Sequence, residues 1–143
     1  MSHTLSFGMS CIFCEIAAGR LAAEIVYRAE GVIAFLDHRP LFPGHVLLIP
    51  EQHVETLADL PAALIGPLFE AAQKLERAVE TALEAQGSFI AVNNRVSQSV
   101  PHLHVHIVPR NKGDGLKGFF WPRHDYDSGE HLREVARKIR DVI

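Results

Sequence analysis

Three histidines alternate with aliphatic residues in the second half of the chain: His102, His104 and His106 are separated by Leu103 and Val105. Imidazole titrates near neutral pH and can act as a nucleophile, a proton donor or a metal ligand. In a β-strand this spacing puts all three rings on one face, whereas a helix would scatter them. An amphipathic strand with polar surface histidines would explain one such ring. Three in strict alternation favour an active site.

The chain has two cysteines, Cys11 and Cys14, in a C-x-x-C arrangement. Two closely spaced thiols supply half of a zinc site, and two further ligands are needed to complete it. From the residues alone, a reversible disulfide and a pair of reduced buried thiols remain open alternatives.

The elements that must position these residues follow from hydrophobic periodicity. Apolar residues at three- and four-residue intervals predict an amphipathic helix over 61–86, ended by Gly87, and Ser128 is expected to cap a C-terminal helix. Alternation and β-branched content predict five strands, at 24–28, 32–36, 45–49, 89–93 and 102–108. We therefore predict an α+β domain with a mainly antiparallel five-stranded sheet. Residues 1–10 are expected to be a flexible N-terminus and 11–143 a single domain.

Composition narrows the function classes. The 143 residues carry a formal net charge of −3 and are 48% hydrophobic. This balance disfavours nucleic acid and anionic membranes as partners, because both attract clustered positive charge. No apolar run is long enough for a membrane-spanning helix, and no signal peptide is recognisable, so a cytoplasmic location is expected.

The segment from Gln98 to Arg110 resembles the signature of the histidine triad (HIT) family of nucleotide hydrolases and transferases. The resemblance covers nearly the whole chain and implies a HIT-like fold. It extends to four further segments, at 11–16, 34–37, 43–50 and 112–115.

The resemblance implies a role for each candidate catalytic residue. His104, the middle triad histidine, would attack the α-phosphate of a nucleotide derivative. His106 and the Ser99 hydroxyl would stabilise the negative charge that develops. Gln98 would contact the leaving group or the attacking water, and His45 would approach the same phosphate pocket.

Two further positions match nucleotide-binding residues of the family. Asp37 would contact the ribose, or would merely be a turn residue at the end of a strand. Asn93 would lie near the phosphate, or would only bond to its own loop backbone. Four basic residues downstream would form a positive rim for phosphates or simply face solvent: Arg110, Lys112, Lys117 and Arg123.

The resemblance also supplies candidates to complete the cysteine half-site. In bacterial members with this cysteine pair, His53 and His102 would be the other two ligands of a structural Zn²⁺. Two thiolates and two imidazoles make a closed tetrahedral shell with no position left for substrate. Without metal, His102 would be a hydrogen-bonding scaffold.

The leading hypothesis is an enzyme that cleaves the α-phosphate bond of nucleoside monophosphate conjugates through a nucleotidyl-His104 intermediate. Its substrate would be an AMP-containing purine nucleotide, either an adenosine phosphoramidate or a dinucleoside polyphosphate. As in the family, we expect a homodimer built through the long helix and a sheet edge. The alternatives are a nucleotide-binding signalling or adaptor module with little turnover, and a zinc-buffering or redox protein.

Overall fold

The structure of the protein is a computed structural model that describes residues 11–116 and 123–143. The expectation for residues 1–10 lies outside these ranges. The predicted α+β architecture is confirmed: one five-stranded antiparallel sheet has the order β1-β2-β3-β5-β4. Its strands are β1 (Ile25–Ala29), β2 (Val32–Leu36), β3 (Val46–Pro50), β4 (Gly87–Val92) and β5 (Val105–Arg110). The helices are α2 (Ile12–Ala17), the 3-10 turn η1 (Leu57–Asp59), α3 (Ala62–Leu83) and α4 (Gly129–Arg140).

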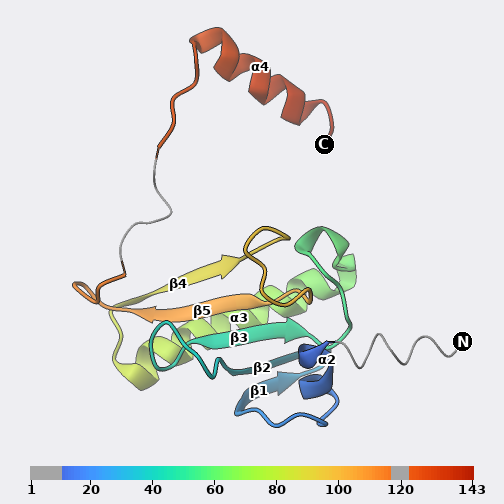
Figure 1. The fold of residues 1–143 in the computed structure, drawn as a ribbon, viewed down its shortest axis with the longest axis vertical. Helices are drawn as coiled ribbons and strands as arrows, with labels where there is room; N and C mark the ends of the chain where they lie inside the picture. Colours follow the sequence, from blue (N-terminus) through green and yellow to red (C-terminus); the bar gives the residue numbers. More distant parts are fainter. Residues whose placement is uncertain (1–10, 117–122) are drawn as a thin grey trace, which may run out of the picture.

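Both faces of the sheet are covered, and alternation along the strands decides what each face contacts. On β2, Val32 and Ala34 are in the core cluster with α3, the long helix that runs along the sheet in Figure 1. Ile33 and Phe35 belong to the opposite cluster, which includes Phe13 of α2. Side chains two apart on a strand share a face, so one short strand supplies two cores.

The triad segment differs from the prediction, because β5 begins at Val105 and not at His102. Pro50, on the neighbouring strand β3, has no N–H and therefore cannot donate the backbone hydrogen bond that would extend the pairing of β3 with β5. The N–H of Leu103 instead donates to the Val54 carbonyl (2.8 Å). The His102 N–H donates to the Val100 carbonyl (2.8 Å), so the chain bends at residues 101 and 102 before the strand begins. The expected alternation survives, since Leu103 and Val105 are buried on the α3 side.

Helix ends also differ from the prediction. Helix α3 ends at Leu83, because Glu84 takes a left-handed conformation (φ 52°). Gln86 then donates its N–H to the Arg110 carbonyl (3.1 Å), so the chain is already aligned with β5 where Gly87 begins β4. Sequence analysis missed α2, a six-residue helix whose N-cap is Cys11.

The C-terminal helix α4 is present with its predicted cap, since Ser128 Oγ accepts the His131 N–H (3.0 Å). Figure 1 shows α4 apart from the sheet, and none of its residues is buried. Within the described ranges, no helix has the length and apolar character needed to cross a membrane.

Candidate active site and metal centre

Four side chains from three separate parts of the chain converge at one end of the sheet: Cys11, Cys14, His53 and His102. One ligand atom from each lies within 4.8 Å of all the others. Cys11 caps α2 and Cys14 lies inside it, whereas His53 follows β3 and His102 precedes β5. This cluster can hold a metal ion, and it is the predicted ligand set.

The separations fit a tetrahedral ion. His102 Nδ1 lies 3.4 Å from Cys11 Sγ, 3.5 Å from Cys14 Sγ and 3.2 Å from His53 Nδ1. Bond lengths of about 2.3 Å for Zn–S and 2.0–2.1 Å for Zn–N give ligand separations of roughly 3.5 Å for S···N and 3.3 Å for N···N around a tetrahedron. The donor set and these separations are therefore compatible with one tetrahedrally coordinated metal ion such as Zn²⁺.

Neighbouring groups set the tautomer of His102 and shift the pKa values of His102 and Cys14. The Pro50 carbonyl lies 2.8 Å from His102 Nε2, so that nitrogen carries the proton and Nδ1 keeps its lone pair for a metal. Burial lowers the pKa of His102 to about 4 and holds the ring neutral. Burial, helped by Cys11, raises the pKa of Cys14 to about 11, so a thiolate here needs a compensating cation.

His104 is buried, and a backbone carbonyl two residues earlier orients its ring. The His102 carbonyl lies 2.7 Å from His104 Nδ1, and a carbonyl only accepts, so Nδ1 carries the proton. Burial also lowers the pKa of His104. The neutral ring thus has its lone pair on Nε2, the form that a nucleophile requires.

A second pair of imidazoles lies beside His104. The Leu41 N–H donates to His45 Nδ1 (3.1 Å), so the His45 proton is on Nε2, which donates to His106 Nδ1 (3.0 Å). Neutral His106 must then carry its own proton on Nε2. This relay leaves His106 as a hydrogen-bond donor next to the lone pair of His104, with ring centroids 4.8 Å apart.

His104 and His106 open onto a cavity of about 680 Å³, a size suited to a small ligand. Asp37, Ser99, His104 and His106 supply polar groups to it, together with Glu24 and His38. The remaining wall is mainly apolar and comes from α2, the turn after it, β2 and β3. Its members are Ile12, Phe13, Ile16, Leu21, Ala22, Ala23, Phe35, Leu36, Leu47 and Val100.

Three other predicted substrate residues, Gln98, Asn93 and His45, are not part of this lining. Gln98 braces the preceding loop, because its Oε1 accepts the Arg95 N–H (2.8 Å) and its Nε2 donates to the Glu55 carbonyl (2.7 Å). Asn93 directly follows β4, and His45 acts through His106. Asp37 lines the cavity, and its Oδ1 accepts the Arg39 N–H of a turn (2.9 Å).

Sequence reasoning missed the contribution of α2 to the cavity. Ile12 and Phe13, between the two cysteines, line it together with Ile16. Apolar residues at positions 13, 16 and 17 were the available signal of a short amphipathic helix. The cysteine spacing drew attention to metal ligation alone.

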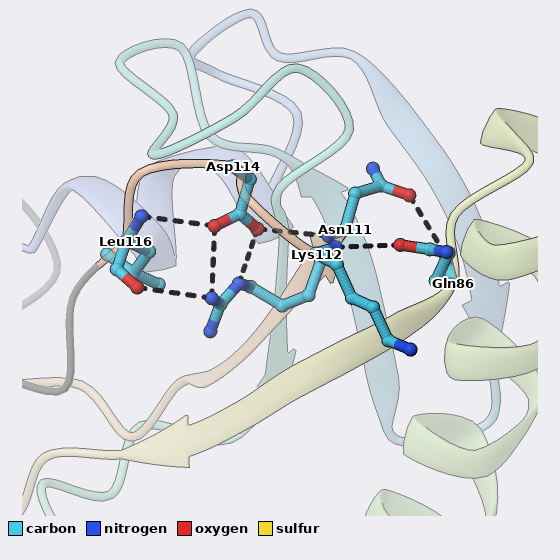
Figure 2. Close-up of polar contacts among 6 residues, drawn as sticks. Gln86, Asn111, Lys112, Asp114 and Leu116 are labelled. Atoms are coloured by element: carbon cyan, nitrogen blue, oxygen red, sulfur yellow. Dashed lines mark hydrogen bonds and ion pairs between the residues drawn. The ribbon is translucent and has the colours of Figure 1, made fainter.

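Of the suggested positive rim, the three members that the structure describes do not line the cavity: Arg110, Lys112 and Arg123. Arg110 donates to Asp114 from Nε (2.6 Å) and from Nη2 (3.0 Å), and it holds the pKa of the Asp114 carboxyl well below its usual range. Figure 2 shows this loop, in which the Lys112 N–H also donates to Gln86 Oε1 (2.7 Å). Arg110, the last residue of β5, and Lys112 therefore help to hold the turn that follows the strand, and Lys117 lies outside the described residues.

Comparison with known proteins decides the family. A family model described as the HIT domain matches residues 18–113. The chain belongs to the HIT family. The HIT-family "Protein hit" of Bacillus subtilis is 39% identical over 134 residues, which cover 91% of this chain and 92% of that protein.

Solved HIT structures share the fold. A HIT-family crystal structure from Bacillus subtilis has a TM-score of 0.86 at 37% identity and covers 93% of this chain and 96% of its own. A zinc-bound histidine triad family protein from Mycobacterium smegmatis has a TM-score of 0.72 at 34% identity. The match covers 95% of this chain and 99% of that chain.

Some relatives with HIT domains carry the names of hydrolases. The asymmetrical bis(5'-nucleosyl)-tetraphosphatase of Schizosaccharomyces pombe is 38% identical over 96 residues, 66% of this chain and 53% of that enzyme. The adenylylsulfatase HINT3 of Arabidopsis thaliana is 31% identical over 108 residues, 74% and 55% of the two chains.

Proposed function

We propose that this HIT protein is a hydrolase or transferase that cleaves nucleoside monophosphate conjugates at the α-phosphate. The observation that carries the proposal is the His104 ring on the cavity wall, with its proton held at Nδ1 by the His102 carbonyl and its lone pair on Nε2. A polar end beside a largely apolar wall suits a ligand that joins a phosphate to a purine base.

The reaction would proceed in two displacements. His104 Nε2 attacks the α-phosphorus, the bond from phosphorus to the leaving group breaks, and the leaving group departs with its electron pair and takes up a proton. Water or another acceptor then attacks the phosphorus of the nucleotidyl-histidine, which releases the nucleoside monophosphate and restores the imidazole. Splitting one displacement into two lowers the barrier of each step.

Neighbouring residues would stabilise the charge that develops on the phosphate oxygens. The proton on His106 Nε2 and the Ser99 hydroxyl can both donate to these oxygens. His45 holds His106 in the donor tautomer through the 3.0 Å contact, and Asp37 on the same cavity can accept from a ribose hydroxyl. Gln98 would act by holding the loop that precedes Ser99. Asn93, directly after β4, would lie near the phosphate, as the family resemblance implies.

The names of two relatives support this substrate class, since a dinucleoside tetraphosphate and an adenylyl sulfate are both conjugates of a nucleoside monophosphate. We propose an AMP-containing purine nucleotide as the substrate. Zn²⁺ at the Cys11, Cys14, His53 and His102 cluster would be structural, because four protein ligands close the tetrahedral shell.

The test is to incubate the purified protein with adenosine 5'-phosphoramidate and with diadenosine tetraphosphate and to follow AMP by chromatography. We expect AMP from at least one substrate. His104→Asn should lower the rate at least about 10³-fold while the circular dichroism spectrum and melting temperature stay close to wild type. Release of AMP from neither substrate, by a protein that binds AMP, would favour a binding module over an enzyme.

We also propose a homodimer. The edge strand β4 exposes Ile90, and α3 exposes Ile65 and Phe69, which are each more than two-fifths exposed. An edge strand and large apolar side chains are both features that a partner subunit covers. Sedimentation equilibrium should give twice the chain mass, and Phe69→Glu should give the monomer.

A further inference from the structure

Phe13 belongs at once to the metal centre and to the cavity. It lies between the two cysteine ligands in the sequence, is 5% exposed and lines the cavity. Its ring meets the His104 ring edge to face, with centroids 5.1 Å apart at 85°, and the His102 ring at 5.9 Å and 71°. One side chain therefore contacts a metal ligand and the proposed nucleophile.

The His104 ring depends on such contacts for its orientation. Its Nδ1 has one hydrogen bond, to the His102 carbonyl, and a single bond still allows the ring to tilt about it. Phe13 and His106 pack against the ring at centroid distances of 5.1 Å and 4.8 Å. These two contacts limit the directions in which the Nε2 lone pair can point.

Phe13 in turn depends on the cysteine ligands. Helix α2 has six residues, which is too short to be stable without tertiary contacts. Cys11 Sγ accepts the Cys14 N–H (3.4 Å) and lies 3.4 Å from His102 Nδ1, and Cys14 Sγ lies 3.3 Å from His53 Nδ1. A bound ion that joins these four atoms would hold the helix, and with it Phe13, against His104.

We propose that Phe13 is a positioning residue that links the metal centre to catalysis: held between two metal-ligand thiols, it keeps the His104 ring aimed at the α-phosphorus. The proposal rests on the proposed function, in which His104 is the nucleophile. Displacement at phosphorus requires close alignment, and a misplacement of about 1 Å can cost on the order of 10²-fold in rate.

The first test separates turnover from binding. Phe13→Leu keeps an apolar side chain in the wall but removes the ring. We expect kcat for adenosine 5'-phosphoramidate to fall about 10- to 100-fold, with KM changed less than about threefold. The matched control is Leu75→Ala, since Leu75 is also 5% exposed but packs in the α3 cluster away from the cavity.

Leu75→Ala should lower the melting temperature at least as much as Phe13→Leu does and leave kcat within about twofold of wild type. The proposal is overturned if Phe13→Leu keeps the wild-type kcat, or if both variants lose kcat in proportion to their loss of stability.

The second test does not depend on turnover. Long-range ¹H–¹⁵N spectra of the His104 ring should show one ordered tautomer, protonated at Nδ1, in the zinc-loaded wild-type protein. Removal of the metal with a chelator, or Phe13→Leu with zinc bound, should broaden or average these signals. Sharp signals of the same tautomer in all three samples would contradict the proposal.

The two tests also separate this inference from the proposed function. A wild-type protein that cleaves neither substrate defeats the proposed function, and the spectra still decide whether Phe13 and the metal order His104. Should Phe13→Leu fail to fold, the comparison of the wild-type protein with and without metal decides the question.

Discussion

A protein partner fixes the tautomer of each of the three rings, His102, His104 and His106, and so decides which ring nitrogen keeps its lone pair. Carbonyl oxygens take the Nε2 proton of His102 and the Nδ1 proton of His104, which leaves lone pairs on opposite nitrogens of the two rings. His106 accepts from His45 and becomes a donor. In the proposed function, three identical side chains would thereby take three different roles, as metal ligand, nucleophile and hydrogen-bond donor.

The neutral state of His106 predicts a pH dependence of stability. Burial, reinforced by His104 and His45 and opposed by Asp37, lowers the pKa of His106 to about 4, whereas the unfolded chain has a pKa near 6.5. The unfolded state therefore binds its proton at higher pH, and the free energy of unfolding falls as the pH drops from about 6.5 to 4.

Thermal denaturation between pH 7 and 4.5 measures this dependence. His106→Asn should show a shallower fall in melting temperature than wild type, and replacement of the exposed His124 by Asn should keep the wild-type slope. Equal slopes for all three proteins would show that His106 does not contribute.

At the scale of elements, the turn before β3 decides where His45 lies. β3 is preceded by Gly44, whose φ of +100° turns the chain so that His45 faces His106. A Cβ on Gly44 would come within 2.0 Å of Leu83 Cδ1, near the end of α3. The turn that delivers His45 is thus packed directly against the long helix.

Gly44→Ala is therefore expected to lower the free energy of unfolding by about 1–3 kcal/mol from backbone strain, plus the cost of moving Leu83. Gly19→Ala is the matched control, because Gly19 also has a positive φ (+79°) but no atom lies within 4 Å of its added Cβ. Urea denaturation should give the larger loss for Gly44→Ala. A loss no greater than that of Gly19→Ala would refute the steric argument.

At the scale of the whole molecule, the metal centre joins parts of the chain that are distant in sequence. Cys11 and Cys14 come from α2, His53 from the segment after β3, and His102 from the segment before β5. An ion bound there would link positions 11, 14, 53 and 102, and so would cross-link most of the segment 11–116. The C-terminal helix α4, with no buried residue, contributes nothing comparable to the stability of one chain.

We accordingly expect one zinc ion per chain by elemental analysis and a fall in melting temperature of at least about 10 °C on metal removal, because an ion that binds only the folded state stabilises it by mass action. Cys14→Ser should reproduce the loss. Ser97→Ala is a control on an exposed residue outside the ligand set and should retain both the metal and the melting temperature. Wild-type stability after complete metal removal would contradict a structural role for the ion.

Local patterns were sufficient for much of this molecule. The period of α3, the Ser128 cap and the alternation of Leu103 and Val105 with the histidines are properties of neighbouring residues, and they were predictable. The ends of α3 and β5 were not. Glu84 ends the helix in a left-handed conformation that its residue type does not favour, and Pro50 limits β5 from another strand.

The sequence by itself determined the α+β fold and the alternation of the triad with Leu103 and Val105, and its resemblance to the HIT family supplied the four residues that meet in a cluster able to hold a metal ion. Only the tertiary structure decided which ring nitrogen each histidine presents, that Gln98 bonds to the Arg95 and Glu55 backbone, and that Phe13 contacts His104. The reason is physical: periodicity records which face a side chain occupies, whereas protonation and ring orientation depend on partners such as Pro50, Leu41 and α2, which folding brings from elsewhere in the chain.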